Sequence, residues 1–257
     1  MTRIFNSLSF VASQAPEAQQ ARAELVGLYG HAAPERADVI VALGGDGFML
    51  QTLHTMMNSG KLVYGMNRGS VGFLMNRYSP DRLPQRLADA VENAFHPLEM
   101  QTEDSDGHRR TALAINEVYL FRQSYQAAKL KVAVDGRVRL EELICDGLLL
   151  ATPAGSTAYN LSAHGPILPL DAPLLALTPV SPFRPRRWRG ALVANKATVR
   201  FDVLEGDKRP VNAAADHTEV KSVVSVSVRG SRDKTATLLF DVGHSWNERI
   251  LAEQFRY

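Results

Sequence analysis

The first hundred residues alternate between short apolar runs and segments with helical spacing of their apolar positions. The apolar runs predict strands at 3–13, 37–43 and 61–67. The segments between and after them predict helices at 16–30, 47–60 and 79–94. Ser79 is the expected N-cap of the last helix, and Pro80 stands in its first turn. Strand–helix alternation of this kind indicates a parallel sheet with helices on its faces.

The pattern changes near residue 97, where short strand-like pieces begin to follow one another. Turn signals such as Asp135-Gly136 separate them. The pieces are 111–122, 128–136, 137–143, 147–153, 197–206, 222–230 and 235–243. Several short strands in a row favour a sandwich or a layered sheet. The chain ends in a predicted helix at 247–257.

These patterns predict a fold with an α/β N-terminal domain built on a parallel sheet and a β-rich, sandwich-like C-terminal domain. The expected boundaries are 1–97 for the first domain and 98–235 for the second, with a C-terminal tail, 236–257, that returns to the first. A ligand site is expected between the two domains, because pockets tend to form there.

Charge and cysteine content narrow the function classes. The formal net charge is +2 over 257 residues, too close to neutral to indicate a nucleic-acid partner. The single cysteine, Cys145, excludes an internal disulfide. No run of about 18 apolar residues predicts a membrane span, and the N-terminal stretch lacks the pattern of a secretory leader. The expectation is a soluble cytoplasmic protein without a membrane partner.

A glycine-rich turn follows the strand at 37–43. Gly44, Gly45 and Gly47 surround Asp46 in the stretch GGDG. Such a turn permits close approach of the backbone to a ligand at the end of a strand, where ligands of α/β sheets bind. The spacing fits neither a Walker loop nor a dinucleotide-binding fingerprint. The alternative is a tight turn in which Asp46 caps the next helix.

Two further stretches place polar residues in apolar surroundings. Asn116 and Glu117 lie inside the strand-like run 111–122 and need polar partners there, unless the strand ends and Glu117 is solvated. The stretch 145–168 runs from an apolar strand into small and hydroxyl residues around Tyr159. Its small residues and aromatic ring suit a nucleoside, and the alternative is a loop with a buried tyrosine.

Taken together and in this order, these motifs resemble the NAD kinase family. The matching stretches are GGDG at 44–47, GMNRGSVGFL at 65–74, NE at 116–117 and DGLLLATPAGSTAYNLSAHGPIL at 146–168. GGDG alone is shared with lipid kinases and phosphofructokinases. The resemblance implies a kinase that phosphorylates NAD at the adenosine ribose 2′-hydroxyl with ATP and a divalent metal ion, giving NADP.

The resemblance also implies roles for single residues. Asp46 matches the catalytic aspartate, which takes the proton from the ribose 2′-hydroxyl. Asp216 lies near a family Asp-Gly-Gln segment whose neighbours differ here, and Ala154 stands where many members have threonine. The implied NAD contacts are Asp46, Gly47, Asn116, Glu117, Asp146, Ala154, Thr157, Ala158, Tyr159, Asn160, Leu161, Ser162 and Asp216.

Magnesium is the expected metal ion, held largely by the phosphates and water, and the seven histidines show no pairing that indicates a protein metal site. ATP and polyphosphate both remain open as donors, as do NAD and NADH as acceptors. Two other functions stay open: a lipid or sugar kinase of the same superfamily, disfavoured by Asn116 and Glu117, and a non-catalytic NAD sensor, disfavoured by Asp46.

The last expectation concerns assembly. A β-rich domain exposes strand edges that need covering, and the resembled family forms dimers and tetramers. A homo-oligomer is therefore expected, with the tetramer as its size. The four arginines of the stretch 181–190 lie around Trp188 and are expected in an exposed loop or a subunit contact rather than on phosphates.

Overall fold

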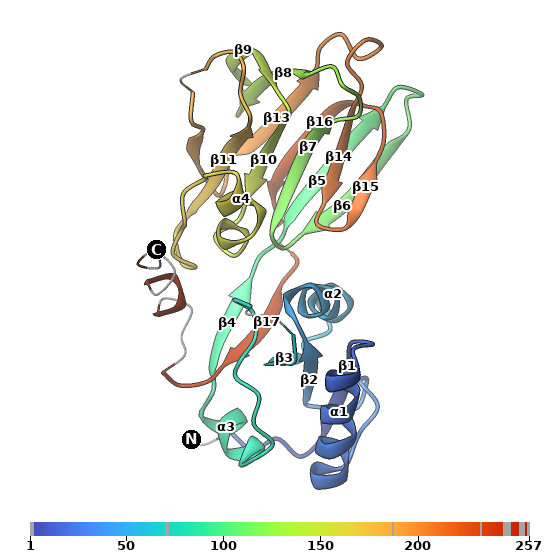
Figure 1. Ribbon diagram of the computed structural model, residues 1–257, viewed down its shortest axis with the longest axis vertical. Helices are drawn as coiled ribbons and strands as arrows, with labels where there is room; N and C mark the ends of the chain where they lie inside the picture. Colours follow the sequence, from blue (N-terminus) through green and yellow to red (C-terminus); the bar gives the residue numbers. More distant parts are fainter. Residues whose placement is uncertain are drawn as a thin grey trace. The chain divides into compact units, whose positions relative to one another are not determined.

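The computed structural model describes residues 3–69, 72–186, 188–231, 233–243, 248–251 and 255. The chain divides into two compact units (Figure 1). Unit 1 comprises residues 1–95 and 234–257, and unit 2 comprises residues 96–233.

Unit 1 is built on a five-stranded sheet in the order β1-β2-β3-β17-β4. Its strands are β1 (Leu8–Ala12), β2 (Val39–Gly44), β3 (Leu62–Asn67), β4 (Val91–Phe95) and β17 (Ala236–Phe240). Its helices are α1 (Pro16–Tyr29), α2 (Asp46–Met56) and α3 (Leu83–Asp89). Four strands pair in parallel, and only β4 runs antiparallel to its neighbour β17. The predicted parallel sheet of the N-terminal domain is confirmed.

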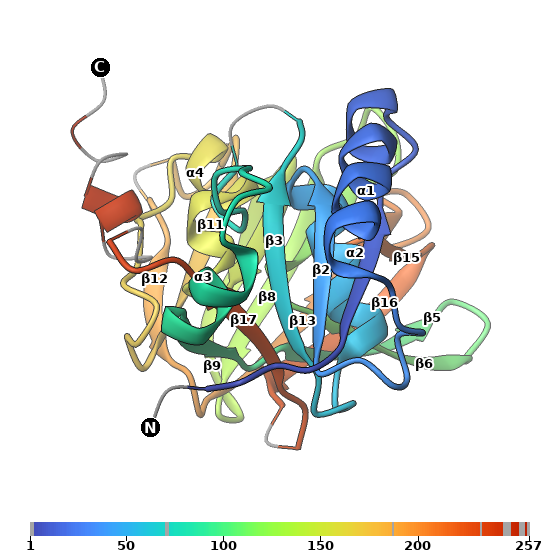
Figure 2. The ribbon, with the colours of Figure 1, turned by 90° about the horizontal axis from the view of Figure 1, so that it is seen from below.

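Helices cover both faces of this sheet (Figure 2). Leu25 of α1 and Leu87 of α3 share one buried cluster with Val41 and Tyr64, so these two helices cover the same face. Neighbouring residues of a strand point to opposite faces, and α2 packs on the side of Gly65. A Cβ on Gly65 would collide with the Met49 side chain, which shows how closely α2 approaches β3.

The helix predicted over 79–94 is wrong at both ends. The helix begins after Arg82, its N-cap, and Ser79 instead accepts the Asp81 N–H at 3.3 Å. The second half of the predicted helix is strand β4, because Val91–Phe95 pairs with β17. A partner from the other end of the chain has overridden the local helical pattern. Residues 248–251 of the predicted C-terminal helix are helical, and 247, 252–254, 256 and 257 lie outside the described residues.

Unit 2 consists of two six-stranded sheets in which all the strand pairs are antiparallel. The first, in the order β12-β11-β10-β7-β14-β15, contains β7 (Glu117–Arg122), β10 (Gly147–Ala151), β11 (Leu174–Val180), β12 (Ala191–Ala194), β14 (Val211–Ala215) and β15 (Thr218–Val220). The second, in the order β6-β5-β16-β13-β8-β9, contains β5 (Leu98–Asp104), β6 (Arg109–Ala114), β8 (Ala128–Val134), β9 (Arg137–Cys145), β13 (Thr198–Val203) and β16 (Val223–Gly230).

The two sheets of unit 2 share one apolar core. Leu120 and Leu148 of the first sheet pack in the same buried cluster as Phe201 and Val226 of the second. The predicted β-rich, sandwich-like fold is therefore confirmed. The expectation of one strand over 111–122 is wrong, because this run contains the end of β6 and the whole of β7. The last predicted strand, 235–243, forms as β17, which pairs with β3 in unit 1.

Short helical turns follow β10, namely η1 (Gly155–Thr157) and α4 (Tyr159–Ser162). Among the described residues, no helix has the length and apolar character needed to cross a membrane.

Candidate functional site

Asp46 stands where strand β2 ends and helix α2 begins. Gly45 is the N-cap and provides no side-chain cap, and Asp46 is the first residue of the helix. Its carboxylate accepts the N–H of Phe73 at 2.6 Å and the N–H of Leu74 at 2.9 Å. The alternative interpretation of Asp46 as a helix cap is therefore wrong, since its side chain holds a different segment of the chain.

The surroundings of Asp46 favour proton transfer. Burial raises the pKa of its carboxyl group, and the two amide hydrogen bonds and the charge of Arg249 oppose that rise. A carboxylate has about four lone-pair positions, so the two amides leave acceptor capacity for a ligand hydroxyl. The neighbouring Gly47 is exposed, and a Cβ there would meet no atom within 4 Å. The carboxylate thus lies beside open backbone that a ligand can approach.

A second carboxylate organises a loop in unit 2. Asp216 accepts the N–H groups of three successive residues, Ile115 at 2.6 Å, Asn116 at 3.0 Å and Glu117 at 3.2 Å. These residues lie about a hundred positions earlier in the chain. Asp216 has a φ of 48°, in the left-handed region that aspartate tolerates in a turn. The Asp216 carboxylate therefore accounts for the break between β6 and β7 that the apolar pattern did not reveal.

The turn after β10 packs against the same break. The Thr152 hydroxyl donates to the Ile115 carbonyl at 2.7 Å and accepts the Gly155 N–H at 3.0 Å. The Thr152 N–H donates to the Asn116 carbonyl at 2.9 Å. A Cβ on Gly155 would collide with the Asn116 backbone, so only glycine permits this approach. The structure thus brings together the 116–117 motif, Asp216 and the start of the 154–162 segment.

Glu117 has an unusual environment within this group. Its Oε2 atom is buried and has no hydrogen-bond partner in the described part of the chain. Burial, together with the nearby charge of Asp216, raises the pKa of the Glu117 carboxyl to about 8. The strand does end here, but Glu117 is not the solvated residue of the alternative interpretation. It is protonated over much of the neutral range and can then donate a hydrogen bond.

The segment 154–162 combines an exposed ring with buried polar groups. The Tyr159 ring is 40% exposed and meets the Tyr119 ring edge-on, with centroids 5.4 Å apart. Asn160 is fully buried: its amide donates to the carbonyls of Ser156 and Pro166, and its oxygen accepts the Thr178 hydroxyl. The amide nitrogen and the oxygen of the Asn160 side chain are thus both used to shape the segment.

The other predicted residues of this segment differ in exposure. Ala154 and Thr157 are buried, whereas Ala158 and Leu161 are half-buried and Ser162 is exposed. Among the predicted contacts in unit 2, Asp146 stands apart. It precedes β10, whose five residues span about 17 Å, and it forms an ion pair with Arg122 at 2.7 Å. Asp146 therefore lies at the opposite end of the strand from the others.

Four residues of these arrangements were not predicted. Thr152 had a signal, because a threonine between an apolar strand and a proline needs a buried partner. Tyr119 follows Glu117 by two residues, so it shares a strand face with it. Gly72 lies in the stretch 65–74 that carries the family resemblance, but nothing local indicated that it contacts Asp46, and Arg249 had no local signal because it acts on Asp46 and its partners across the fold.

A protein metal site does not coincide with either arrangement. In the described part of the chain, the one group of three potential ligands is Asp104, Asp106 and His108, at the turn between β5 and β6. Asp104 Oδ1 already accepts the N–H groups of Asp106 and His108. These bonds explain the cluster as part of the turn itself.

Comparison with known proteins gives consistent results. The model of the ATP-NAD kinase N-terminal domain matches residues 8–95, and that of the ATP-NAD kinase C-terminal domain matches residues 115–239. An NAD kinase of Rhizobium meliloti is 73% identical over 255 residues, covering 99% of both chains. One of Mesorhizobium japonicum is 66% identical over 257 residues, covering all of both chains.

Solved structures show the same fold. Yeast NADH kinase complexed with NADH aligns with a TM-score of 0.86 at 20% identity, covering 99% of this chain and 90% of that one. An NAD kinase from Archaeoglobus fulgidus in complex with ATP aligns with a TM-score of 0.76 at 22% identity, covering 97% of this chain and all of that one.

The raised pKa of Glu117 predicts a specific dependence of stability on pH. The folded protein holds this proton up to about pH 8, whereas the unfolded chain releases it near 4.5. The free energy of unfolding therefore falls as pH rises through this window. Glu117→Gln removes the titration. In urea unfolding, the free energy of unfolding of the variant relative to that of the wild type should rise by about 1–3 kcal/mol between about pH 5 and about pH 8.

Glu141→Gln is the matched control, because Glu141 is an exposed glutamate on β9 in the same unit. Its pH dependence should follow the wild type. Parallel curves for Glu117→Gln and the wild type would show that Glu117 is charged throughout.

Proposed function

Because this chain belongs to the NAD kinase family, its activity is the ATP-dependent phosphorylation of NAD, and we propose that the phosphoryl group goes to the adenosine ribose 2′-hydroxyl, giving NADP. Relatives named NAD kinase match over the whole chain. Neither a lipid or sugar kinase nor a non-catalytic sensor finds support among them.

Asp46 is the proposed general base. A ribose hydroxyl is a weak nucleophile, so a carboxylate must accept its proton as the hydroxyl attacks phosphorus. The observation that carries this role is the fixed, largely buried carboxylate beside open backbone at Gly47. Two backbone amides hold it in one orientation, and burial makes it more basic.

The proposed contacts to the NAD molecule in unit 2 are those around the β6–β7 break. Asn116 and Glu117 are fixed by Asp216, and Tyr159 offers an exposed ring that can pack on a planar base. Asn160 contributes by shaping the segment from Ala154 to Ser162. Asp146 remains a proposed contact at the other end of β10.

A divalent ion, which we take to be Mg²⁺, enters with ATP as part of the substrate. Mg²⁺ keeps much of its water and binds phosphate oxygens readily. No three-ligand carboxylate group lies at Asp46 in the described part of the chain. The role of the protein residues is to orient the hydroxyl and to accept its proton.

Asp46→Asn tests the base. The amide cannot accept the proton, so kcat should fall by about 10²–10⁴-fold. The KM for NAD should change by less than about threefold, since a base acts chiefly in the transition state. Asparagine can accept a hydrogen bond from only one of the two amides, so the free energy of unfolding should fall by about 1–3 kcal/mol. Steady-state kinetics with NAD, ATP and Mg²⁺ measure the first two quantities.

Asp38→Asn provides the matched control in the same unit. The exposed Asp38 also accepts two backbone N–H groups, those of Asn6 and Ser7. It should retain normal kcat whatever stability it loses. Near-normal turnover of Asp46→Asn would remove Asp46 from the mechanism.

Tyr159→Ala tests the nucleoside contact. Loss of a stacked ring should weaken NAD binding by about 1–3 kcal/mol, and Tyr159→Phe should retain most of the affinity if the ring rather than the hydroxyl carries the contact. Calorimetric titration with NAD measures both. Tyr125→Ala, at a ring 87% exposed, is the control and should bind NAD normally. Unchanged affinity in folded Tyr159→Ala would assign Tyr159 a purely structural role.

The protein is further proposed to be a cytoplasmic homo-oligomer, a tetramer in size. Unit 2 exposes apolar side chains on its strands and loops, including Leu192 on β12 and Phe183, and such surfaces favour association. Light scattering at micromolar concentration should give a mass about four times the 28.3 kDa of one chain. A purely monomeric species would contradict the assembly, and fractionation of cells tests the compartment.

A further inference from the structure

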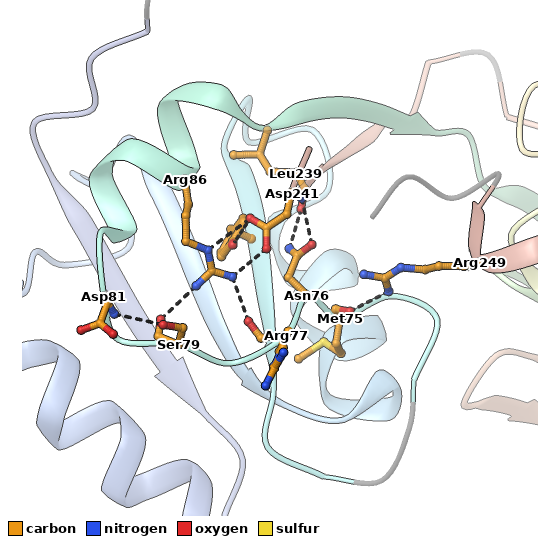
Figure 3. Close-up of polar contacts among 10 residues, drawn as sticks. Met75, Asn76, Arg77, Ser79, Asp81, Arg86, Leu239, Asp241 and Arg249 are labelled. Carbon is orange, nitrogen blue, oxygen red and sulfur yellow. Dashed lines mark hydrogen bonds and ion pairs between the residues drawn. The ribbon is translucent and has the colours of Figure 1, made fainter. Parts of the chain in front are cut away.

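The segment that holds Asp46 is itself held from the other side. The amides of Phe73 and Leu74 point at the Asp46 carboxylate. Carbonyls of the same segment accept hydrogen bonds from Arg249, at 2.8 Å for Phe73 and 2.6 Å for Met75. Figure 3 shows Arg249 reaching Met75. Arg249 belongs to the helical stretch 248–251 near the C-terminus, about 175 positions away from these carbonyls.

One peptide group connects the two charges. The Phe73 carbonyl and the Leu74 N–H are the two ends of a single peptide, so the guanidinium binds its oxygen while the carboxylate binds its hydrogen. Hydrogen bonds in such a chain polarise and strengthen one another. We propose that Arg249 is a positioning residue for Asp46, which it orients through the Phe73–Leu74 peptide.

Close packing makes this position sensitive. A Cβ on Gly72 would collide with the Asp46 carboxylate, so the segment already lies as near to Asp46 as glycine allows. Arg249 binds the opposite side of the segment and prevents it from moving away. Arg249 is itself seated over the Phe240 ring, 5.1 Å from its centroid, next to the buried Ile250.

The charge of Arg249 also acts on the titration of Asp46. Burial raises the pKa of Asp46, and Arg249 is the cation whose charge opposes this rise. A methionine at position 249 would remove the charge and both carbonyl bonds. A lysine would keep the charge but lose the planar, forked donor geometry of a guanidinium.

Arg86 offers a matched comparison on the same segment. It donates to the carbonyls of Arg77 and Ser79 and forms an ion pair with Asp241 at 2.7 Å (Figure 3). Between the two arginines, the buried Asn76 donates to the Leu239 carbonyl and accepts the Asp241 N–H. Arg86 thus anchors the segment without binding the peptide that contacts Asp46.

The kinetic test compares Arg249→Met, Arg249→Lys and Arg86→Met, and it rests on the proposed function. We expect Arg249→Met to lower kcat by about 10²-fold, the scale of a small misplacement of a catalytic group. Its KM for NAD should change little, and the acid limb of its kcat profile should move to higher pH. Arg249→Lys should restore the acid limb and part of kcat. Arg86→Met should lose stability but keep kcat and the acid limb.

A second measurement is independent of turnover. Urea unfolding across pH is compared for the wild type, Asp46→Asn, Arg249→Met and the double variant. The difference in the free energy of unfolding between the proteins with Asp46 and those with Asp46→Asn reports the titration of Asp46. Because the pKa of Asp46 lies above its unfolded value, this difference falls as pH rises through the window above about 3.8. In the Arg249→Met background, the window should extend to higher pH.

The outcomes separate the two proposals. Two results together would overturn the role of Arg249. The pH window of unfolding would be the same with and without Arg249, and the losses of kcat in Arg249→Met and Arg86→Met would both simply match their losses of stability. Normal turnover of Asp46→Asn would instead overturn the base, while the unfolding window would still decide whether Arg249 keeps Asp46 ionised.

Discussion

The hydrogen bonds from Phe73 and Leu74 to Asp46 are the interaction on which the arrangement in unit 1 depends. Without them the carboxylate at the start of α2 would be a helix-terminal charge free to choose its rotamer. With them it is fixed to a segment that begins at Gly72 and continues to α3. That segment needs its own anchors, and Arg249, Asn76 and Arg86 supply them along its length.

Unit 2 uses the same principle with a different outcome. Asp216 also holds consecutive backbone amides, and in doing so it ends strand β6 and starts β7. Because the Asp216 carboxylate binds backbone amides, the side chains of Asn116 and Glu117 are available to other partners. In unit 1 the carboxylate bound by amides is itself the candidate reactive group. In unit 2 it supports the backbone of two proposed NAD contacts, Asn116 and Glu117.

The local patterns predicted the elements that local forces determine. Helix α1 and strands β2 and β3 formed close to the predicted positions. Strand β4 was missed because its pairing with β17 is a long-range contact that the sequence around Val91 does not encode. The GGDG and Asn-Glu motifs marked candidate site residues, but the capping role considered for Asp46 failed because its partners lie 27 and 28 positions away. Arg249 could not be predicted for the same reason, because the carbonyls that it binds lie about 175 positions away in the chain.

Two acidic groups, Asp46 and Glu117, show how the surroundings can separate the behaviour of similar side chains. Burial raises the pKa of both carboxyl groups. At Asp46 two amides and a cation favour the charged form, which suits the proposed general base. At Glu117 the nearby Asp216 adds a like charge and no donor reaches the buried oxygen in the described part of the chain, so the protonated form is favoured. One carboxyl is thereby prepared to accept a hydrogen bond from a ligand hydroxyl and the other to donate one.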